Sequence, residues 1–385
     1  MFVKKTILKV IKRALQPILE SKLFRGKIII LYGARQIGKT TLIKNIQNKY
    51  PDNSLFLNCD EPDIRELLTD TTSTKLKSII GNKDLILIDE AQRVKNIGLT
   101  LKLFSDDIKN VQVIATGSNL FELSNIINEP LTGRKYVYTL MPVSFKELVD
   151  TFGWIETNRL LEERIIYGMY PEIISKPDEK RALLKEITRS YLFKDILSFE
   201  SIRKPEQIEK LLMLLAAQIG NEVSYNELAN TLNMDKDTVS KYIDILEKAF
   251  IIFRLNPFSR NLRTEISKLR KIYFYDTGIR NALISNFNLL DQRNDKGALW
   301  ENFLISEKLK INLIDDIDVK QYFWRTSQQQ EVDYIEEIEG KLYAYELTYS
   351  EKQKKRISKT FLKNYKPQSE KTVNKNNYSE FLGIF

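Results

Sequence analysis

The stretch KIIILYGARQIGKTTLIKNIQ, residues 27–47, decides the fold of the first part of this chain. It opens with branched apolar residues, which predict a buried strand over 27–32, and it ends in a helical pattern over 39–48. Between them lies Gly33-x-x-x-x-Gly38-Lys39-Thr40, the spacing of a P-loop. In such a loop the glycines let backbone N–H groups turn toward a phosphate, and the helix N-terminus adds its dipole. The sequence therefore predicts a nucleotide site here.

Two side chains of this loop have specific expected roles. Lys39 would neutralise the β- and γ-phosphates of the nucleotide, and Thr40 would ligate magnesium. The alternative is a glycine-rich turn that holds no nucleotide. The residues expected to contact the nucleotide are Gly33, Ala34, Arg35, Gln36, Ile37, Gly38, Lys39, Thr40 and Thr41.

A second segment, KDLILIDEAQ at residues 83–92, predicts the other half of the site. Its apolar run indicates a buried parallel strand that ends at Asp89. Asp89 is placed to hold Mg²⁺ through water, and Glu90 follows at once. An acid at that place suits polarisation of an attacking water, which is typical of hydrolysing P-loop proteins. The alternative is that the two acids only cap a strand.

A third strand, VQVIATGSN at 111–119, ends in polar residues that could sense a γ-phosphate; Ser118 is the first candidate and Asn119 the second. With SLFLNCD (54–60) and RKYVYTL (134–140) the sequence contains five strand patterns separated mostly by helical ones. This order predicts the fold class: α/β, with a P-loop parallel sheet and helices on both faces. Arg134 could reach a γ-phosphate, its own or a neighbour's, or form a structural ion pair.

Several of these blocks together resemble a known family. They are GARQIGKTTL (33–42), LILIDEAQ (85–92), ATGSN (115–119), LTGRKYVYTLMPVSFKEL (131–148) and GMYPEII (168–174). Their order resembles bacterial and archaeal AAA+-type ATPases that carry a C-terminal domain of unknown function related to restriction nucleases. The resemblance runs from about residue 20 to 350. It implies ATP and Mg²⁺ as ligands, with Lys39, Thr40, Asp89 and Glu90 in the roles given above.

The middle of the chain has a different organisation. Residues 144–205 are mostly helical in pattern and suggest a connector or lid. Residues 221–258 have a helix-turn-helix layout, with a short helix opened by Ser224 and a long second helix from Lys236. Two further strand patterns flank a basic segment between them. We therefore expect a winged helix over 206–288.

This winged helix could contact duplex DNA through its second helix and its basic wing. The alternative is a lid or a protein-docking element, because Asp235, Asp237 and Asp244 on the second helix would repel phosphates. The wing segment also contains Lys271. The residues expected to contact nucleic acid are Lys236, Thr238, Lys241, Arg260, Arg263, Lys268 and Arg270.

The last part, 289–385, predicts a small α+β domain similar to restriction nucleases. Glu301 on a helix, with Asp333 and Glu346 on consecutive strands, match three acids that gather Mg²⁺ in such enzymes. The lysine usually found two residues after the last acid is replaced by Thr348, so we expect a nuclease-like fold without activity. The alternative is that these acids are solvent-exposed side chains without a metal-binding role. SEFLGIF (379–385) is expected to form an edge strand.

Composition limits the remaining possibilities. The chain has 385 residues and a net charge of +9, which favours an anionic partner. It contains no histidine, so the usual zinc ligand and general base are missing, and its one cysteine cannot form an internal disulfide. No apolar run is long enough to span a membrane. The pattern predicts a cytoplasmic protein with domains at 1–143, 144–205, 206–288 and 289–385.

The sequence thus favours an ATP-hydrolysing enzyme coupled to nucleic acid through a winged helix. One rival is a nucleotide-gated switch that binds a protein partner with little turnover. Another is an ATP-regulated nuclease. An oligomer, in which a neighbour's Arg134 completes the site, is a further expectation that the sequence leaves open.

Overall fold

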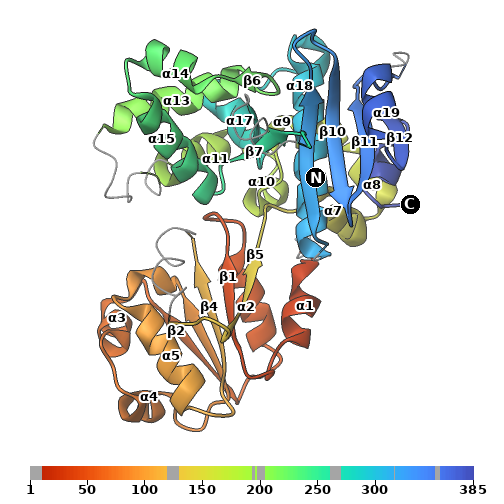
Figure 1. The fold of residues 1–385 in the computed structure, drawn as a ribbon. Coiled ribbons are helices and arrows are strands. Elements are labelled where there is room, and N and C mark those ends of the chain that lie inside the picture. The colour runs from red at the N-terminus through yellow and green to blue at the C-terminus, as the bar shows by residue number, and fades with distance from the viewer. Residues whose placement is uncertain are drawn as a thin grey trace, which may run out of the picture. The chain divides into compact units, whose positions relative to one another are not determined.

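The computed structural model describes residues 11–118, 130–192, 196, 204–260, 270–315, 317–351 and 356–385. The chain forms two compact units, each described here by itself (Figure 1). The first unit consists of residues 11–142 with Lys248–Phe250. The second unit consists of Val143–Glu247 with Ile251–Phe385.

The first unit is built on a five-stranded sheet in which every neighbouring pair is parallel, with strand order β2-β3-β4-β1-β5. The strands are β1 (Ile28–Tyr32), β2 (Ser54–Asn58), β3 (Leu85–Asp89), β4 (Gln112–Gly117) and β5 (Lys135–Thr139). Because every connection between parallel strands needs a crossover, helices lie between them in the sequence. The predicted α/β fold with a parallel sheet is confirmed.

Burial explains why these segments form strands. Every residue of β1, β3 and β4 is buried, whereas the edge strands β2 and β5 are largely half-buried. Continuous apolar runs of this kind are expected where helices cover both faces of a sheet. The helices of this unit are α1 (Leu15–Ser21), α2 (Lys39–Gln47), α3 (Pro62–Leu68), α4 (Ser73–Ile80) and α5 (Ile97–Asp107), with a 3₁₀ turn η1 at Ala91–Arg93. Helices α2 and α5 cover opposite faces (Figure 1).

The second unit begins with short helices and continues into a mixed region. The first helices are α7 (Phe145–Phe152), α8 (Trp154–Arg159), α9 (Leu161–Tyr167), α10 (Pro171–Ser175) and α11 (Lys180–Glu186), followed by a π-helical turn, Ile187–Leu192. Ser144 opens α7 with a complete capping box, in which its side chain and that of Glu147 each accept a backbone N–H bond. Residues 168–170 separate α9 from α10.

Beyond residue 203 the second unit alternates helices with strands. The elements are α13 (Pro205–Ala217), β6 (Glu222–Val223), α14 (Tyr225–Leu232), α15 (Lys236–Lys248), β7 (Ile252–Pro257), β8 (Arg270–Phe274), α17 (Thr277–Leu283), η3 (Leu290–Gln292), α18 (Lys296–Ile314), β9 (Val319–Arg325), β10 (Glu331–Ile338), β11 (Lys341–Leu347), α19 (Lys359–Tyr365), β12 (Ser369–Val373) and α20 (Tyr378–Phe381).

One seven-stranded sheet, in the order β12-β11-β10-β9-β7-β8-β6, runs through these elements. Strands β7 and β9 pair in parallel, with Asn256 opposite Tyr322. One continuous sheet therefore contains strands from both sides of the predicted boundary at residue 288. The four predicted domains stay predictions about how the chain is organised.

One expected strand is wrong. Residues 379–385 were expected to form an edge strand, but Tyr378–Phe381 form helix α20, and the edge strand is β12. The side chains of Tyr378 and Leu382 are buried, and Phe145 contacts the Tyr378 ring at 5.7 Å between centroids. Apolar residues at positions 378, 381 and 382 suit one face of a helix, and packing against this aromatic cluster selects that conformation over a strand.

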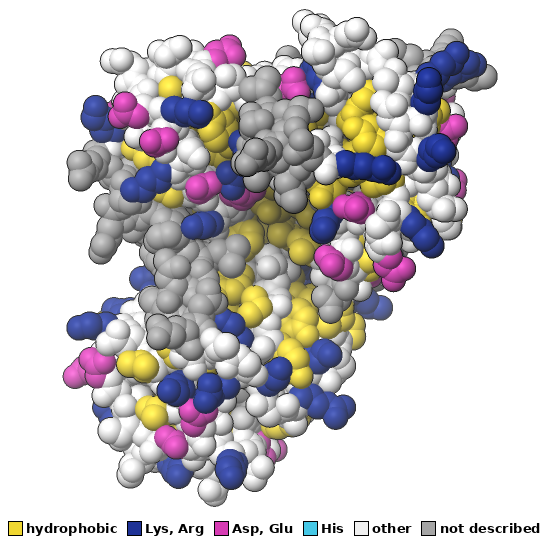
Figure 2. Space-filling model, viewed as in Figure 1, with side chains coloured by type: hydrophobic (Ala, Val, Ile, Leu, Met, Phe, Trp, Pro, Cys, Tyr) yellow, Lys and Arg dark blue, Asp and Glu magenta, His cyan; other side chains and the backbone are white. Residues whose placement is uncertain are grey.

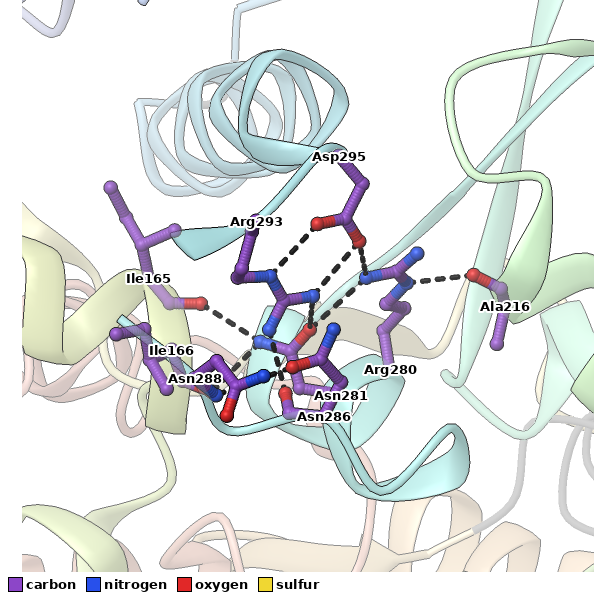
Figure 3. A network of polar contacts seen from close by, with 9 residues as sticks. All are labelled: Ile165, Ile166, Ala216, Arg280, Asn281, Asn286, Asn288, Arg293 and Asp295. Atoms are coloured by element: carbon purple, nitrogen blue, oxygen red, sulfur yellow. Dashed lines mark hydrogen bonds and ion pairs between the residues drawn. The ribbon is translucent and has the colours of Figure 1, made fainter. Parts of the chain in front are cut away.

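A buried polar network holds several helices of the second unit together (Figure 3). Arg280 donates to the carbonyl of Ala216 at 2.7 Å and forms an ion pair with Asp295. Arg293 donates to the same carboxylate at 2.8 Å, and Asn281 donates to the carbonyl of Ile166 at 2.9 Å. The network therefore links α17 with the ends of α9 and α13 and with the start of α18.

Surface charge is mixed on the face drawn in Figure 2. Lys and Arg side chains are scattered among Asp and Glu side chains over both units there. Within the described residues, none of the helices is both long and apolar enough to cross a membrane.

Candidate nucleotide site and acidic cluster

The P-loop connects the carboxyl end of β1 to the first residue of α2. Gly33 and Gly38 both have positive φ, 152° and 92°. A Cβ on Gly33 would lie 2.3 Å from the carbonyl oxygen of Leu140 and 2.4 Å from Cδ1 of Ile37. Only glycine fits there, because any side chain would collide with the backbone that directly follows the neighbouring strand β5. The tight turn required to wrap a phosphate is therefore built into the loop.

The side chain of Lys39 lies inside this loop. Its Nζ donates to the carbonyls of Gly33 and Ala34, at 2.8 and 2.9 Å, and the residue is buried. Two carbonyl oxygens of the loop thus hold the ammonium group in the loop that would also bind the phosphate. Of the other loop residues, Ile37 is buried, Arg35 and Gln36 are half-buried, and Thr41 is exposed.

Hydroxyl and carboxylate groups from the first turn of α2 and from the ends of β3 and β4 meet beside the loop. Thr40 Oγ1 donates to Asp89 Oδ2 at 2.7 Å, and Thr116 Oγ1 donates to Asp89 Oδ1 at 2.5 Å. Thr116 also accepts the backbone N–H of Glu90, at 3.1 Å. Asp89 is buried. Oxygen ligands are what Mg²⁺ prefers, so this donor set fits that ion.

Glu90 adopts an unusual backbone conformation. Its φ is 53°, in the left-handed region, which costs a non-glycine residue some free energy. Gln92 Nε2 donates to Glu90 Oε2 at 2.6 Å and also to Ser118 Oγ at 3.0 Å. Ser118 therefore lies in the same group as Glu90. Asn119, the second sensor candidate, lies outside the described residues.

Three contributors to this site were not singled out from the sequence. Thr116 lies in the predicted strand 111–119 and Gln92 in the segment 83–92, but neither was given a role from the sequence. Arg13 donates to the carbonyl of Ile37 at 2.7 Å and to that of Met141 at 2.6 Å. It fixes the P-loop from 24 residues before Ile37, and no local motif signals such a long-range bond.

Arg134 does not lie beside its own P-loop. Strand β5 runs parallel to β1, with Ile28 opposite Lys135 and Tyr32 opposite Thr139. Arg134 precedes this strand, at the amino edge of the sheet, and the P-loop follows β1 at the carboxyl edge. Its Nε donates to Asp106 Oδ1 at 2.6 Å. The suggestion that Arg134 reaches its own γ-phosphate is therefore wrong, because the length of the strand separates the two.

The candidate nucleic-acid residues lie on the second unit. Lys236 and Lys241 on α15 and Arg260 after β7 are exposed, whereas Thr238 and Arg270 are half-exposed. Arg263 and Lys268 lie outside the described residues. Asp244, one of the acids expected to repel phosphates, pairs with Arg254 at 2.7 Å, and Glu247 pairs with the same guanidinium. Asp235 and Asp237 remain exposed.

Lys271 was counted in the basic wing segment, but its side chain is buried. It is 2% exposed and forms ion pairs with Glu301, at 3.0 Å, and with Glu331. Tyr273 donates to the same Glu301 carboxylate. Burial by itself would lower the pKa of Lys271, but Glu301, Tyr273, Glu331 and Asp333 raise it well above its ordinary value. Lys271 is therefore an internal cation that cannot contact phosphates.

The expected metal ligands do not form a metal site. Burial and the nearby Asp333 raise the pKa of Glu301 above its ordinary value, although Lys271 offsets part of this rise. Asp333 Oδ2 accepts the backbone N–H of Leu347 at 2.8 Å, and Glu346 is buried. Across the described residues there is no group of three or more His, Cys, Asp and Glu side chains placed to hold a metal ion. The suggested grouping of these acids around Mg²⁺ is wrong, because Lys271 supplies the positive charge instead.

Known protein families match three parts of the chain. An AAA domain matches residues 25–149. A domain of unknown function (DUF8612) matches residues 158–290, and a second domain of unknown function (DUF4143) matches residues 296–382. An AAA domain at 25–149 followed by a C-terminal domain of unknown function at 296–382 is the order that the sequence resemblance implied.

Related chains occur in both archaea and bacteria. An uncharacterized protein of Methanocaldococcus jannaschii is 28% identical over 338 residues, which cover 82% of this chain and 74% of the relative. An uncharacterized protein of Mycobacterium tuberculosis is 27% identical over 334 residues, covering 86% of this chain and 72% of the relative. Their descriptions give no activity.

Solved structures with weak similarity include the RuvB Holliday junction branch migration motor of Thermotoga maritima. It is 19% identical with a TM-score of 0.32, covering 62% of this chain and 87% of that one. Similarity at this level says nothing about what this chain binds.

Proposed function

We propose that the first unit binds ATP with Mg²⁺ and hydrolyses it. The observation that carries this proposal is the group formed by Lys39, Thr40, Asp89, Thr116 and Glu90 at the carboxyl ends of β1, β3 and β4. Three different crossovers bring these residues to one edge of the sheet. In parallel α/β sheets this edge is where ligands bind.

The residues present fit the nucleotide and its metal. Gly33 to Thr41 would surround the phosphates, and Lys39 would exchange its two carbonyl partners for phosphate oxygens. Thr40 and Asp89 already bond each other at 2.7 Å, so both oxygens could face one Mg²⁺. The bound metal would neutralise phosphate charge. Glu90 would orient and polarise the attacking water, and Ser118 would contact the γ-phosphate.

Gln92 supports a further detail of this proposal. It donates to Glu90 and to Ser118 at once, so it ties the water-polarising acid to the γ-phosphate contact. Contact of Ser118 with a γ-phosphate would then change the position of Glu90. Such a link would make hydrolysis depend on the presence of the γ-phosphate.

Steady-state ATP hydrolysis by the full chain tests this proposal. Lys39→Ala should abolish both ATP binding and turnover. Glu90→Gln should retain ATP binding while turnover falls by about 10²-fold or more, because general-base contributions are of that size. Lys75→Ala serves as a matched control, since that lysine is exposed on α4 of the same unit and is not part of the P-loop. Equal turnover in wild type and Glu90→Gln would contradict the assigned role.

A second candidate function is binding of duplex DNA by the segment 206–288. The order α13, β6, α14, α15, β7, β8, with β8 between β6 and β7, is that of a winged helix-turn-helix, which supports this proposal. Neutralisation of Asp244 by Arg254 removes one of the three repelling acids. Lys236, Thr238 and Lys241 would face the major groove, and Arg260, Arg263, Lys268 and Arg270 would contact phosphates.

Fluorescence anisotropy with a labelled duplex tests the DNA proposal. Lys236→Glu with Lys241→Glu should weaken binding and lower its dependence on salt, because each cation releases a counterion from DNA. Lys248→Glu, an exposed lysine at the far end of the same helix, is the matched control. If the double variant binds as the wild type does, α15 does not contact the duplex.

The rival proposal is a nucleotide-gated switch that binds a protein partner. Asp235 and Asp237 favour it, because both remain exposed at the start of α15. Tight ATP binding without turnover, unaffected by DNA, would favour this rival. An ATP-regulated nuclease is less well supported, since Lys271 occupies the acidic cluster. If the protein assembles into oligomers, Arg134 could still act on a neighbour's nucleotide, which Arg134→Ala would test by slowing turnover only in the oligomer.

A further inference from the structure

A cavity of about 320 Å³ lies among the first helices of the second unit, apart from the nucleotide site and the acidic cluster. Its walls come from α7, α8, α9 and α10. Most of the lining is apolar, from Leu148, Phe152, Leu160, Ile174 and Pro177. A volume of this size lies at the lower end of the range for small-molecule sites.

Two polar side chains line this cavity without full partners. Arg164 is 4% exposed, and its Nη1 is a buried donor with no hydrogen-bond partner among the described residues. Thr157 is 3% exposed, and its hydroxyl likewise finds no partner there. A buried donor without an acceptor costs about 1–3 kcal/mol, and more when it is charged, so proteins rarely leave one in place without a use.

The charges around the cavity favour an anion. Arg164 Nη2 lies 3.3 Å from Glu163 Oε1. Lys180 Nζ lies 3.0 Å from Oε2 of the same carboxylate. Glu156, also in the lining, pairs with Arg159 at 3.1 Å. The two acids of the lining thus pair with three basic side chains, Arg159, Lys180 and Arg164, which leaves one positive charge in excess.

We propose that this cavity binds a small amphipathic monocarboxylate. The apolar body of the ligand would lie against Leu148, Phe152 and Ile174. Its carboxylate would accept from Nη1 of Arg164 and from the hydroxyl of Thr157. A guanidinium is suited to this role, because it stays protonated when buried and presents donors in a fixed plane.

The cavity has an apolar surround that a ligand of this kind can use. Phe152 and Leu160, both in the lining, are 39% and 40% exposed. Large apolar side chains grouped beside a cavity indicate a binding region more than scattered ones do. The proposal does not depend on ATP binding or on DNA binding.

Isothermal titration of the full chain with octanoate tests the proposal, with octan-1-ol as the matched neutral ligand. Octanoate should bind saturably, and octanol should bind at least about 10-fold more weakly, since a hydrogen bond to a charged group is lost. Arg164→Met should weaken octanoate binding by about 10- to 100-fold and leave octanol binding nearly unchanged.

A second pair of variants keeps the test independent of folding. Leu160→Glu places a negative charge at the mouth of the cavity and should weaken octanoate binding, but not octanol binding. Leu313→Glu, an equally exposed leucine of the same unit, at 44%, should change neither. Equal binding of octanoate and octanol, no saturable binding of octanoate up to about 5 mM, or unchanged binding in both Arg164→Met and Leu160→Glu would each overturn the proposal.

Discussion

Substitution of Lys271 should destabilise the second unit by far more than an ordinary surface change. The residue is 2% exposed, and it is the cation that contacts Glu301 and Glu331. Lys271→Met retains most of the apolar volume but removes the cation from two largely buried carboxylates, so that Glu301 keeps only its bond from Tyr273 and Glu331 keeps only Arg325, at 4.0 Å. Removal of one member of a buried ion pair costs about 3–5 kcal/mol, because the remaining charge stays desolvated.

Intrinsic fluorescence isolates the unit in which this change occurs. The chain contains three tryptophans, Trp154, Trp300 and Trp324, and all three belong to the second unit. Urea denaturation followed by tryptophan emission therefore reports on this unit alone. With a slope of about 2–3 kcal/mol per molar urea, the midpoint should fall by about 1–2 M.

Two further variants decide whether charge is the cause. Lys320→Met makes the same change at an exposed lysine of the same sheet and should shift the free energy of unfolding by less than about 0.5 kcal/mol. Lys271→Met combined with Glu301→Gln should recover part of the loss, since one stranded carboxylate is gone. A loss in Lys271→Met no larger than that in Lys320→Met would refute the interpretation of Lys271 as an internal counter-ion.

Three other outcomes follow from the structure. Burial of Asp295 opposes ionisation, but Arg293 and Arg280 outweigh it and lower the pKa to about 2 from 3.8. The stability from this carboxylate is present above pH 3.8 and is lost as pH falls toward 2, so the tryptophan-detected midpoint should fall more steeply in wild type than in Asp295→Asn over that interval. Gly33→Ala should abolish ATP binding measured by equilibrium dialysis, whereas Gly26→Ala, in open space, should not. Arg13→Met should weaken binding of a fluorescent ATP analogue by about 10-fold, because two loop-fixing hydrogen bonds to a charged donor are lost; an unchanged affinity would argue against that role.

The parallel sheet and its loop could be predicted because their signals are local. A strand pattern, four spaced residues and a helix pattern all fall within 27–47, and the loop has little choice of conformation once Gly33 and Gly38 are in place. The ends of β3 and β4 were predicted for the same reason. Segments whose conformation depends on packing were harder: apolar residues of 378–382 suit a strand or a helix, and only the aromatic cluster around Tyr378 selects the helix.

The sequence by itself therefore determined the class of protein, the chain segments that form the strands of the parallel sheet and the residues that could hold a phosphate. Only the tertiary structure decided which distant side chains meet. Strand register places Arg134 at the sheet edge opposite its own P-loop, packing of α18 against β8 places Lys271 beside Glu301, and the fold brings Arg13 to the P-loop. Each of these contacts joins residues far apart in the chain, so it depends on topology and packing, and no spacing within a motif encodes it.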